Sequence, residues 1–66
     1  MPINVQAIKK AMLTKRLTNK TLSEKAGMTV AGLNKILAGK SIPRLETIYN
    51  ISMALDVNPE EIIIDE

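Results

Sequence analysis

Apolar residues recur at intervals of three and four along most of the chain, and no segment alternates apolar and polar residues for long. Intervals of three and four place apolar side chains on one face of a helix, whereas sustained alternation is typical of a strand. The pattern therefore predicts an all-α fold with five helices, at about residues 4–15, 19–25, 29–38 and 44–55 and from residue 58 onward.

The predicted helices share one small apolar core. The residues expected to line it are Val5, Ile8, Met12, Leu22, Ala26, Leu33, Ile36, Leu37, Leu45, Ile48, Ile51 and Leu55. Glycine and proline are scarce and, apart from Gly32, stand at segment edges, so no linker divides the chain. We expect residues 1–66 to form a single domain.

Capping residues stand at the expected ends of the helices. Asn4, Thr18 and Thr29 each have a side-chain oxygen that can accept a hydrogen bond from the free N–H groups of a first helical turn. Gly27 and Gly39 follow the second and third helices, where a positive φ closes a helix at little cost for glycine.

The stretch "NPEE" at residues 58–61 is the clearest local signal in the chain. Asn58 can cap a helix, Pro59 suits its first position, and Glu61 can complete a capping box. The following "IIIDE" fits either a last helical turn or a short strand that pairs with residues 2–4. Three consecutive isoleucines cannot all face one small core from a helix, so both alternatives stay open.

Composition excludes several kinds of site. The 66 residues include neither cysteine nor histidine, which excludes disulfides and argues against zinc and iron–sulfur centres. Two common catalytic side chains are thereby absent, so we expect no enzyme, no cofactor and no small-molecule substrate. No apolar run approaches the roughly 20 residues that span a bilayer, and no signal peptide opens the chain, so we expect a cytoplasmic protein.

The charges are distributed unevenly. Residues 1–45 hold all nine basic residues and a single acid, Glu24, for a net charge of +8, whereas residues 46–66 hold six acids and no base, for −6. This asymmetry is either ordinary solvated surface charge or a cationic face for a polyanion with an acidic tail directed away from it.

The second and third predicted helices are short and only a few residues apart, which is the spacing of a helix-turn-helix. Leu22 and Leu33 would meet in the angle between the helices, and the small Ser23 would let them approach. Gly27 can make the tight turn, and Ile36 would anchor the third helix to the core. The same spacing also fits an ordinary corner between two helices of a small bundle.

About residues 8–62 resemble the Cro and phage-repressor (XRE-type) helix-turn-helix proteins. The matching positions are Leu22, Ser23, Gly27, Leu33, Ile36, Gly39, Lys40, Pro43 and the closing run "LETIYNISMALDVNPEEI". The resemblance implies a lambda-repressor-like domain, with or without a short terminal β-strand pair, of bacterial, phage or mobile-element origin. It further implies a transcriptional regulator, usually a repressor, that inserts helix 29–38 in the major groove of double-stranded DNA as a homodimer on a palindromic operator.

Three positions depart from this family. Where the family often has an arginine and a glutamate that pair between the first and third helices, this chain has Met12 and Leu37. Packed apolar residues often replace a buried ion pair at no loss of stability, so we expect these two side chains to touch. Arg44 stands where the family has a capping serine or threonine, so a cap of about 1 kcal/mol is missing, and the guanidinium either reaches a phosphate or stays solvated.

The resemblance places the DNA contacts at the start of the second helix and along the exposed side of the third. For base readout it selects Val30, Ala31, Asn34 and Lys35, and for phosphates Asn19, Lys20, Thr29, Lys40, Ser41 and Arg44. Lys35 suits guanine, Asn34 suits adenine, and the two apolar residues suit a thymine methyl. Gly32 either is a weak helix position or lets the helix sit closer to the groove.

In this family the fifth helix and the segment before it often form the dimer contact. The candidates here are Met53, Asp56, Val57, Pro59, Ile62, Ile63 and Ile64. Alternatively, Ile62 and one neighbour fill the core and the third isoleucine is exposed without a role.

An antitoxin or anti-repressor-like module that binds a protein through the same fold is the alternative function. The third helix opens with Val30, Ala31 and Gly32, which carry no side-chain hydrogen-bonding group. The basic first part of the chain favours DNA.

Overall fold

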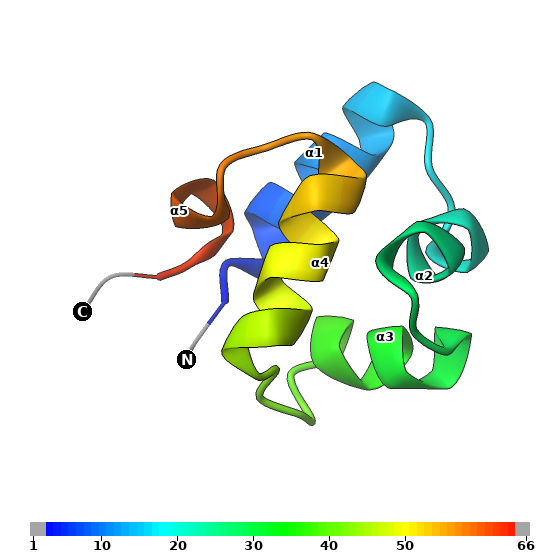
Figure 1. The fold of residues 1–66 in the computed structure, drawn as a ribbon, viewed down its shortest axis with the longest axis vertical. Coiled ribbons are helices and arrows are strands. Elements are labelled where there is room, and N and C mark those ends of the chain that lie inside the picture. Colours follow the sequence, from blue (N-terminus) through cyan, green and yellow to red (C-terminus); the bar gives the residue numbers. More distant parts are fainter. Residues whose placement is uncertain (1–2, 65–66) are drawn as a thin grey trace.

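Helix α4 (Leu45–Leu55) runs through the middle of the molecule, and three other helices pack against it (Figure 1). These are α1 (Val5–Lys15), α2 (Asn19–Ala26) and α5 (Pro59–Ile62), while α3 (Val30–Leu37) packs on α2. The computed structural model describes residues 3–64. The predicted all-α fold with five helices is confirmed, and the bounds of the first four helices lie within one residue of those expected.

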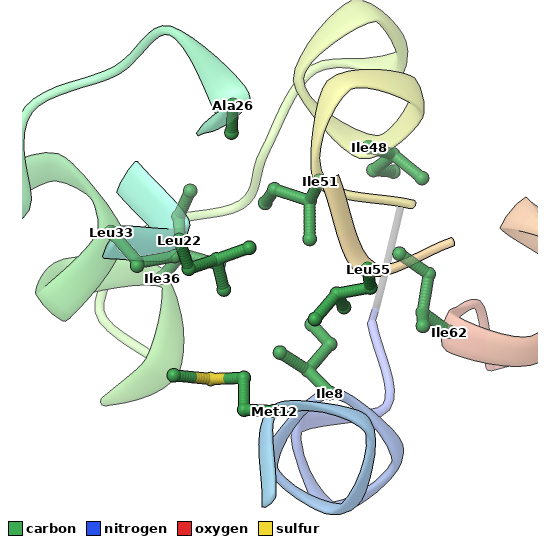
Figure 2. Close-up of a cluster of buried hydrophobic side chains, with 10 residues drawn as sticks. All are labelled: Ile8, Met12, Leu22, Ala26, Leu33, Ile36, Ile48, Ile51, Leu55 and Ile62. Atoms are coloured by element: carbon green, nitrogen blue, oxygen red, sulfur yellow. The ribbon is translucent and has the colours of Figure 1, made fainter. Parts of the chain in front are cut away.

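Buried apolar side chains from all five helices form the core (Figure 2). They are Ile8, Met12, Leu22, Ala26, Leu33, Ile36, Ile48, Ile51, Leu55 and Ile62. The prediction that Leu45 lies in this core is wrong, because its side chain is 46% exposed. Residues 45, 48 and 51 are three apart, and these six residues fall short of the roughly 7.2 residues in two full turns of a helix. Position 45 is therefore rotated away from the face that Ile51 and Leu55 share.

The predicted caps of the first three helices are present. The side-chain oxygens of Asn4, Thr18 and Thr29 each accept a hydrogen bond from the N–H three residues later, at 3.1, 3.2 and 3.0 Å. Arg44 makes no such bond at the start of α4, so the expected loss of a cap is confirmed. Gly27 closes α2 with a φ of 69°, as its position predicted.

Non-glycine residues in the left-handed conformation end α1 and α4. They are Arg16 and Asp56, each with a φ of 57°. Lys15 Nζ lies 3.6 Å from Asp56 Oδ2, so an ion pair joins these two helix ends. Both side chains are well exposed, and such a pair contributes at most about 1 kcal/mol.

The end of the described chain is extended and pairs with its beginning. Glu61 accepts a hydrogen bond from the backbone N–H of Asn58 at 2.8 Å, and α5 ends one residue later. Ile3 and Ile63 then form an isolated antiparallel bridge. Of the two alternatives, pairing with the first residues is confirmed for this one bridge, while positions 2, 65 and 66 lie outside the described residues.

Candidate nucleic-acid interface

Helix α3 has one buried side and one exposed side. Its buried side consists of Leu33 and Ile36, with Leu37 partly covered. The four predicted readout residues, Val30, Ala31, Asn34 and Lys35, are all exposed. Val30 lies four residues before Asn34, and Ala31 four before Lys35. Residues at this spacing are neighbours on a helix surface, so the four side chains share one exposed face of α3.

The packing of α2 fixes the direction of that exposed face. Leu22 and Leu33 are fully buried in the same core, as predicted (Figure 2). Ser23 is buried as well, and its hydroxyl donates to the carbonyl oxygen of Lys20 at 2.7 Å, so this buried hydroxyl has a hydrogen-bond partner. Because α2 also packs against α4, the turn at Gly27 presents the outer side of α3 on the surface of the whole molecule.

The six predicted phosphate residues lie in three segments: the start of α2, the position before α3 and the loop after α3. Asn19 and Lys20 begin α2, Thr29 precedes α3, and Lys40, Ser41 and Arg44 lie between α3 and α4; all six are exposed. The Thr29 hydroxyl oxygen is already an acceptor in the cap of α3. Its hydroxyl hydrogen is the group that it can still offer to a phosphate.

A hydrogen bond that the sequence did not predict joins α2 to α3. Asn19 Nδ2 donates to Asn34 Oδ1 at 2.9 Å. Within residues 3–64, every other side-chain hydrogen bond spans three residues, so this one alone links two helices through side chains. Its partners belong to the two separate groups of predicted DNA contacts, one for phosphate and one for bases.

An open hollow of about 530 Å³ adjoins this pair of asparagines. Its lining residues are Lys9, Met12, Leu13, Leu17, Asn19, Asn34, Leu37 and Ala38. Met12 and Leu37 thus face the same hollow, and the direct contact expected between them stays a prediction. Lys9 is a cationic neighbour that the sequence analysis missed, although it stands only three residues before Met12 on α1 and so shares its side of the helix.

A comparison with protein families matches residues 8–62 to the model described as "Helix-turn-helix". The chain belongs to the helix-turn-helix family. It is of the Cro and phage-repressor type, and it is a DNA-binding transcriptional regulator. In this helix-turn-helix protein, α2 and α3 are the two helices of the motif and Gly27 lies in its turn.

The fold is also that of the restriction-modification controller protein C.AhdI from Aeromonas hydrophila. The crystal structure of C.AhdI matches with a TM-score of 0.81 over 86% of each chain, at 24% sequence identity. No curated protein sequence matches the chain. In the part of the regulator that the structure describes, no helix is both long and apolar enough to cross a membrane.

Among the described residues, the lysines around α3 have no carboxylate partners. Within residues 3–64 the only ion pair joins Lys15 to Asp56, at the ends of α1 and α4. Lys20, Lys35 and Lys40 are exposed and belong to no ion pair in this part of the chain. The motif of the regulator therefore presents positive charge to the solvent.

The predicted dimer residues differ widely in exposure. Met53 is 79% exposed on α4, and Asp56 and Ile64 are also exposed. Val57, Pro59 and Ile63 are partly buried, and Val57 and Ile63 pack on the core of their own chain. Ile62 is 1% exposed, so its side chain belongs to the core and offers no area to a second copy.

Proposed function

We propose that this regulator is a repressor that binds a palindromic operator as a two-fold dimer, with α3 in the major groove. The observation that carries the proposal is the division of α3 into a buried and an exposed side. A major groove about 12 Å wide admits one helix, and the exposed face of α3 carries side chains that suit base edges.

The exposed face of α3 would recognise bases through hydrogen bonds and through apolar contacts. Lys35 can donate to O6 and N7 of guanine, and Asn34 offers a carboxamide one position earlier. Val30 and Ala31 suit contact with a thymine methyl group. Because few of these side chains are donors, each half-site supplies little specificity, so two half-sites about one helical turn apart are needed.

Phosphate contacts would supply most of the affinity. Asn19 and Lys20 at the start of α2, together with Thr29, Lys40, Ser41 and Arg44, offer donors or cations for this role. Each phosphate neutralised by a cation contributes about −0.9 to the slope of log K against log salt. Binding should therefore weaken steeply as the salt concentration rises.

The second copy would dock on exposed residues of α4 and of the segments that flank α5. Met53 and Ile64 supply apolar area there, and Asp56 and Pro59 lie between them in the chain. The palindrome follows from the symmetry of the dimer.

A controller protein of restriction–modification has this fold, which supports a regulator that acts in the cytoplasm of a bacterium.

The second candidate function is capture of a protein, as in an antitoxin or anti-repressor. It is supported by the exposed apolar side chain of Val30 at the start of α3. The two functions differ in their need for the neighbouring lysines. DNA binding requires these cations, whereas capture of a protein does not.

Binding of Ala31→Glu to fluorescent mixed-sequence duplex DNA tests the proposal. Thr14→Glu is the matched control because it adds the same charge at another exposed helical position, on α1. We expect Ala31→Glu to weaken binding at least tenfold and Thr14→Glu to change it little. Equal losses in both variants, with unchanged circular dichroism, would contradict insertion of α3, and an inert wild type would favour protein capture.

A further inference from the structure

The hollow between α1 and α3 has an apolar lining to which the proposed function assigns no ligand. Its volume of about 530 Å³ lies within the range of about 300–1,000 Å³ that is typical of small-molecule sites. Five of its lining residues are apolar: Met12, Leu13, Leu17, Leu37 and Ala38. Met12 is 7% exposed and Leu13 is 81% exposed, so the apolar lining extends from the core out to the surface. A ligand with an apolar body would remove this surface from water, which favours binding.

The polar side chains of the hollow all offer hydrogen-bond donors. They are Lys9, Asn19 and Asn34, and among the described lining residues Lys9 alone is charged. Lys9 belongs to no ion pair within residues 3–64. Asn19 Nδ2 uses one hydrogen for the bond to Asn34 Oδ1, which leaves its second hydrogen and both hydrogens of Asn34 Nδ2 without a partner in this part of the chain. The hollow therefore matches an anionic group and disfavours a cation.

We propose that this hollow binds a small amphipathic anion, with one carboxylate, sulfonate or sulfate group on an apolar body. The body would cover Met12, Leu13 and Leu37, and the anionic group would bind Lys9 and the free amide hydrogens. The size of the hollow favours a small molecule over a protein segment. A stable protein interface takes about 20–30 residues on each side, whereas eight residues line the hollow.

Binding of this anion would exclude DNA, and this consequence rests on the proposed function. Asn19 is a predicted phosphate contact and Asn34 a predicted base contact, and both line the hollow. A ligand seated there covers them, so one copy of the regulator cannot hold the ligand and the operator together. Each ligand then lowers the affinity for the other by the same factor. The hollow would thus be an inducer site within the DNA-binding domain.

Fluorescence titration with anilinonaphthalene sulfonate (ANS), an anion with an aromatic body, tests the site without DNA. We expect saturable binding of one ANS per chain, with a dissociation constant of roughly 10–100 µM, the range typical of the ligand efficiency of drug-sized molecules. Decanoate should displace it. Leu13→Glu adds a carboxylate to the lining and should weaken ANS binding roughly tenfold. Thr14→Glu adds the same charge at the next exposed position of α1, outside the lining, and should have little effect.

The neutral analogue N-phenylnaphthylamine separates the charge of the ligand from its apolar contacts. Lys9→Gln should weaken ANS binding roughly fivefold and leave binding of the neutral analogue unchanged. Lys10→Gln removes the same charge from an exposed position outside the lining and should affect neither ligand. A Lys9→Gln variant that binds both ligands as the wild type does would overturn the assignment of the anionic group.

Urea unfolding with and without ANS shows which state of the chain binds it, because ANS also binds partly unfolded proteins. A ligand of the folded state stabilises that state, so the urea midpoint should rise with ANS concentration. A lower midpoint, absence of saturable binding in the wild type, or equal losses in Leu13→Glu and Thr14→Glu would overturn the site.

Decanoate added to the complex with mixed-sequence duplex DNA, at constant ionic strength, tests the exclusion of DNA. At a decanoate concentration ten times its dissociation constant, the DNA affinity of the wild type should fall roughly tenfold, and that of Leu13→Glu should not respond. An ANS site whose occupation leaves the DNA affinity unchanged would overturn the inducer role. A chain that binds ANS but no duplex even without decanoate would overturn the proposed function and the inducer role, while the anion site stands.

Discussion

The hydroxyl of Thr29 occupies the space beside Gly32 that a larger residue would need. Thr29 Oγ1 accepts a hydrogen bond from the N–H of Gly32 at 3.0 Å, and a Cβ at position 32 would lie 3.1 Å from the same oxygen. A glycine inside a helix costs about 1 kcal/mol relative to alanine. The cap of α3 thus supplies a structural reason for Gly32 that is separate from a close approach to DNA.

A double-mutant cycle separates the contribution of the cap from the cost of the glycine. Gly32→Ala should change the free energy of unfolding little in the wild type, because the gain in helix propensity is offset by the close contact with Thr29. In the Thr29→Ala background, which itself loses about 1 kcal/mol, the same substitution should stabilise by up to about 1 kcal/mol. Urea unfolding measures both effects, and equal values would show that the two residues do not interact.

Substitutions at Leu37 test the expected contact with Met12. Leu37 packs on the core and faces the same hollow as Met12. We expect Leu37→Glu to cost about 1–2 kcal/mol and to lower Tm by roughly 5–10 °C. Leu37→Gln separates lost packing from added charge, and Met12→Arg in the glutamate background should recover part of the loss. An unchanged Tm in Leu37→Glu would refute the contact.

Lys35 and Lys40 should differ in how their loss affects DNA binding. Lys35→Ala should relax the base preference at one position, since a good contact to guanine discriminates by about 1–3 kcal/mol. Lys40→Ala should weaken all duplexes alike and reduce the steepness of the log–log salt slope by about 0.9. Titrations of matched and mismatched duplexes at several salt concentrations distinguish the two. An intact base preference in Lys35→Ala would show that its role is wrongly assigned.

Met53→Glu tests the proposed dimer surface, and Leu13→Glu is its matched control. The two residues are 79% and 81% exposed, so neither substitution disturbs the core, and both add the same charge. We expect Met53→Glu to lower the dimer fraction in sedimentation equilibrium and Leu13→Glu to leave it unchanged. A lower dimer fraction in Leu13→Glu alone, or an unchanged dimer fraction in both variants, would show that Met53 on α4 is not part of the interface. Truncation of the tail before Ile62 is unsuitable because it would remove a core residue.

Local signals in the sequence determine much of this fold. Asn4, Thr18 and Thr29 predicted where helices begin because a cap depends only on a residue and the N–H groups two or three positions later. Gly27 predicted the turn because the ability to adopt a positive φ belongs to the glycine itself. Leu45 was misplaced because apolar spacing averages over a helix and says little about the angular position of its first residue.

Contacts between distant segments could not be predicted in the same way. The Asn19–Asn34 bond depends on the angle between α2 and α3, which their packing sets, and no sequence interval encodes it. The bridge between Ile3 and Ile63 was one of two alternatives that the sequence left open, and α5 decides between them because it brings the end of the described chain back to its beginning. For the candidate site, the sequence and the family resemblance predicted which residues are exposed on α3, but not that one of them, Asn34, is bonded to Asn19 at the start of α2.

Selection of bound sequences from a random duplex pool, at low and at near-physiological salt, tests most directly that α3 reads DNA within a two-fold dimer. We expect a palindrome with half-sites about one helical turn apart, and a more selective pool at the higher salt, where non-specific phosphate binding is weaker. A single, unrepeated half-site would contradict the dimer. No enriched sequence at either salt concentration would contradict sequence-specific DNA binding by this protein.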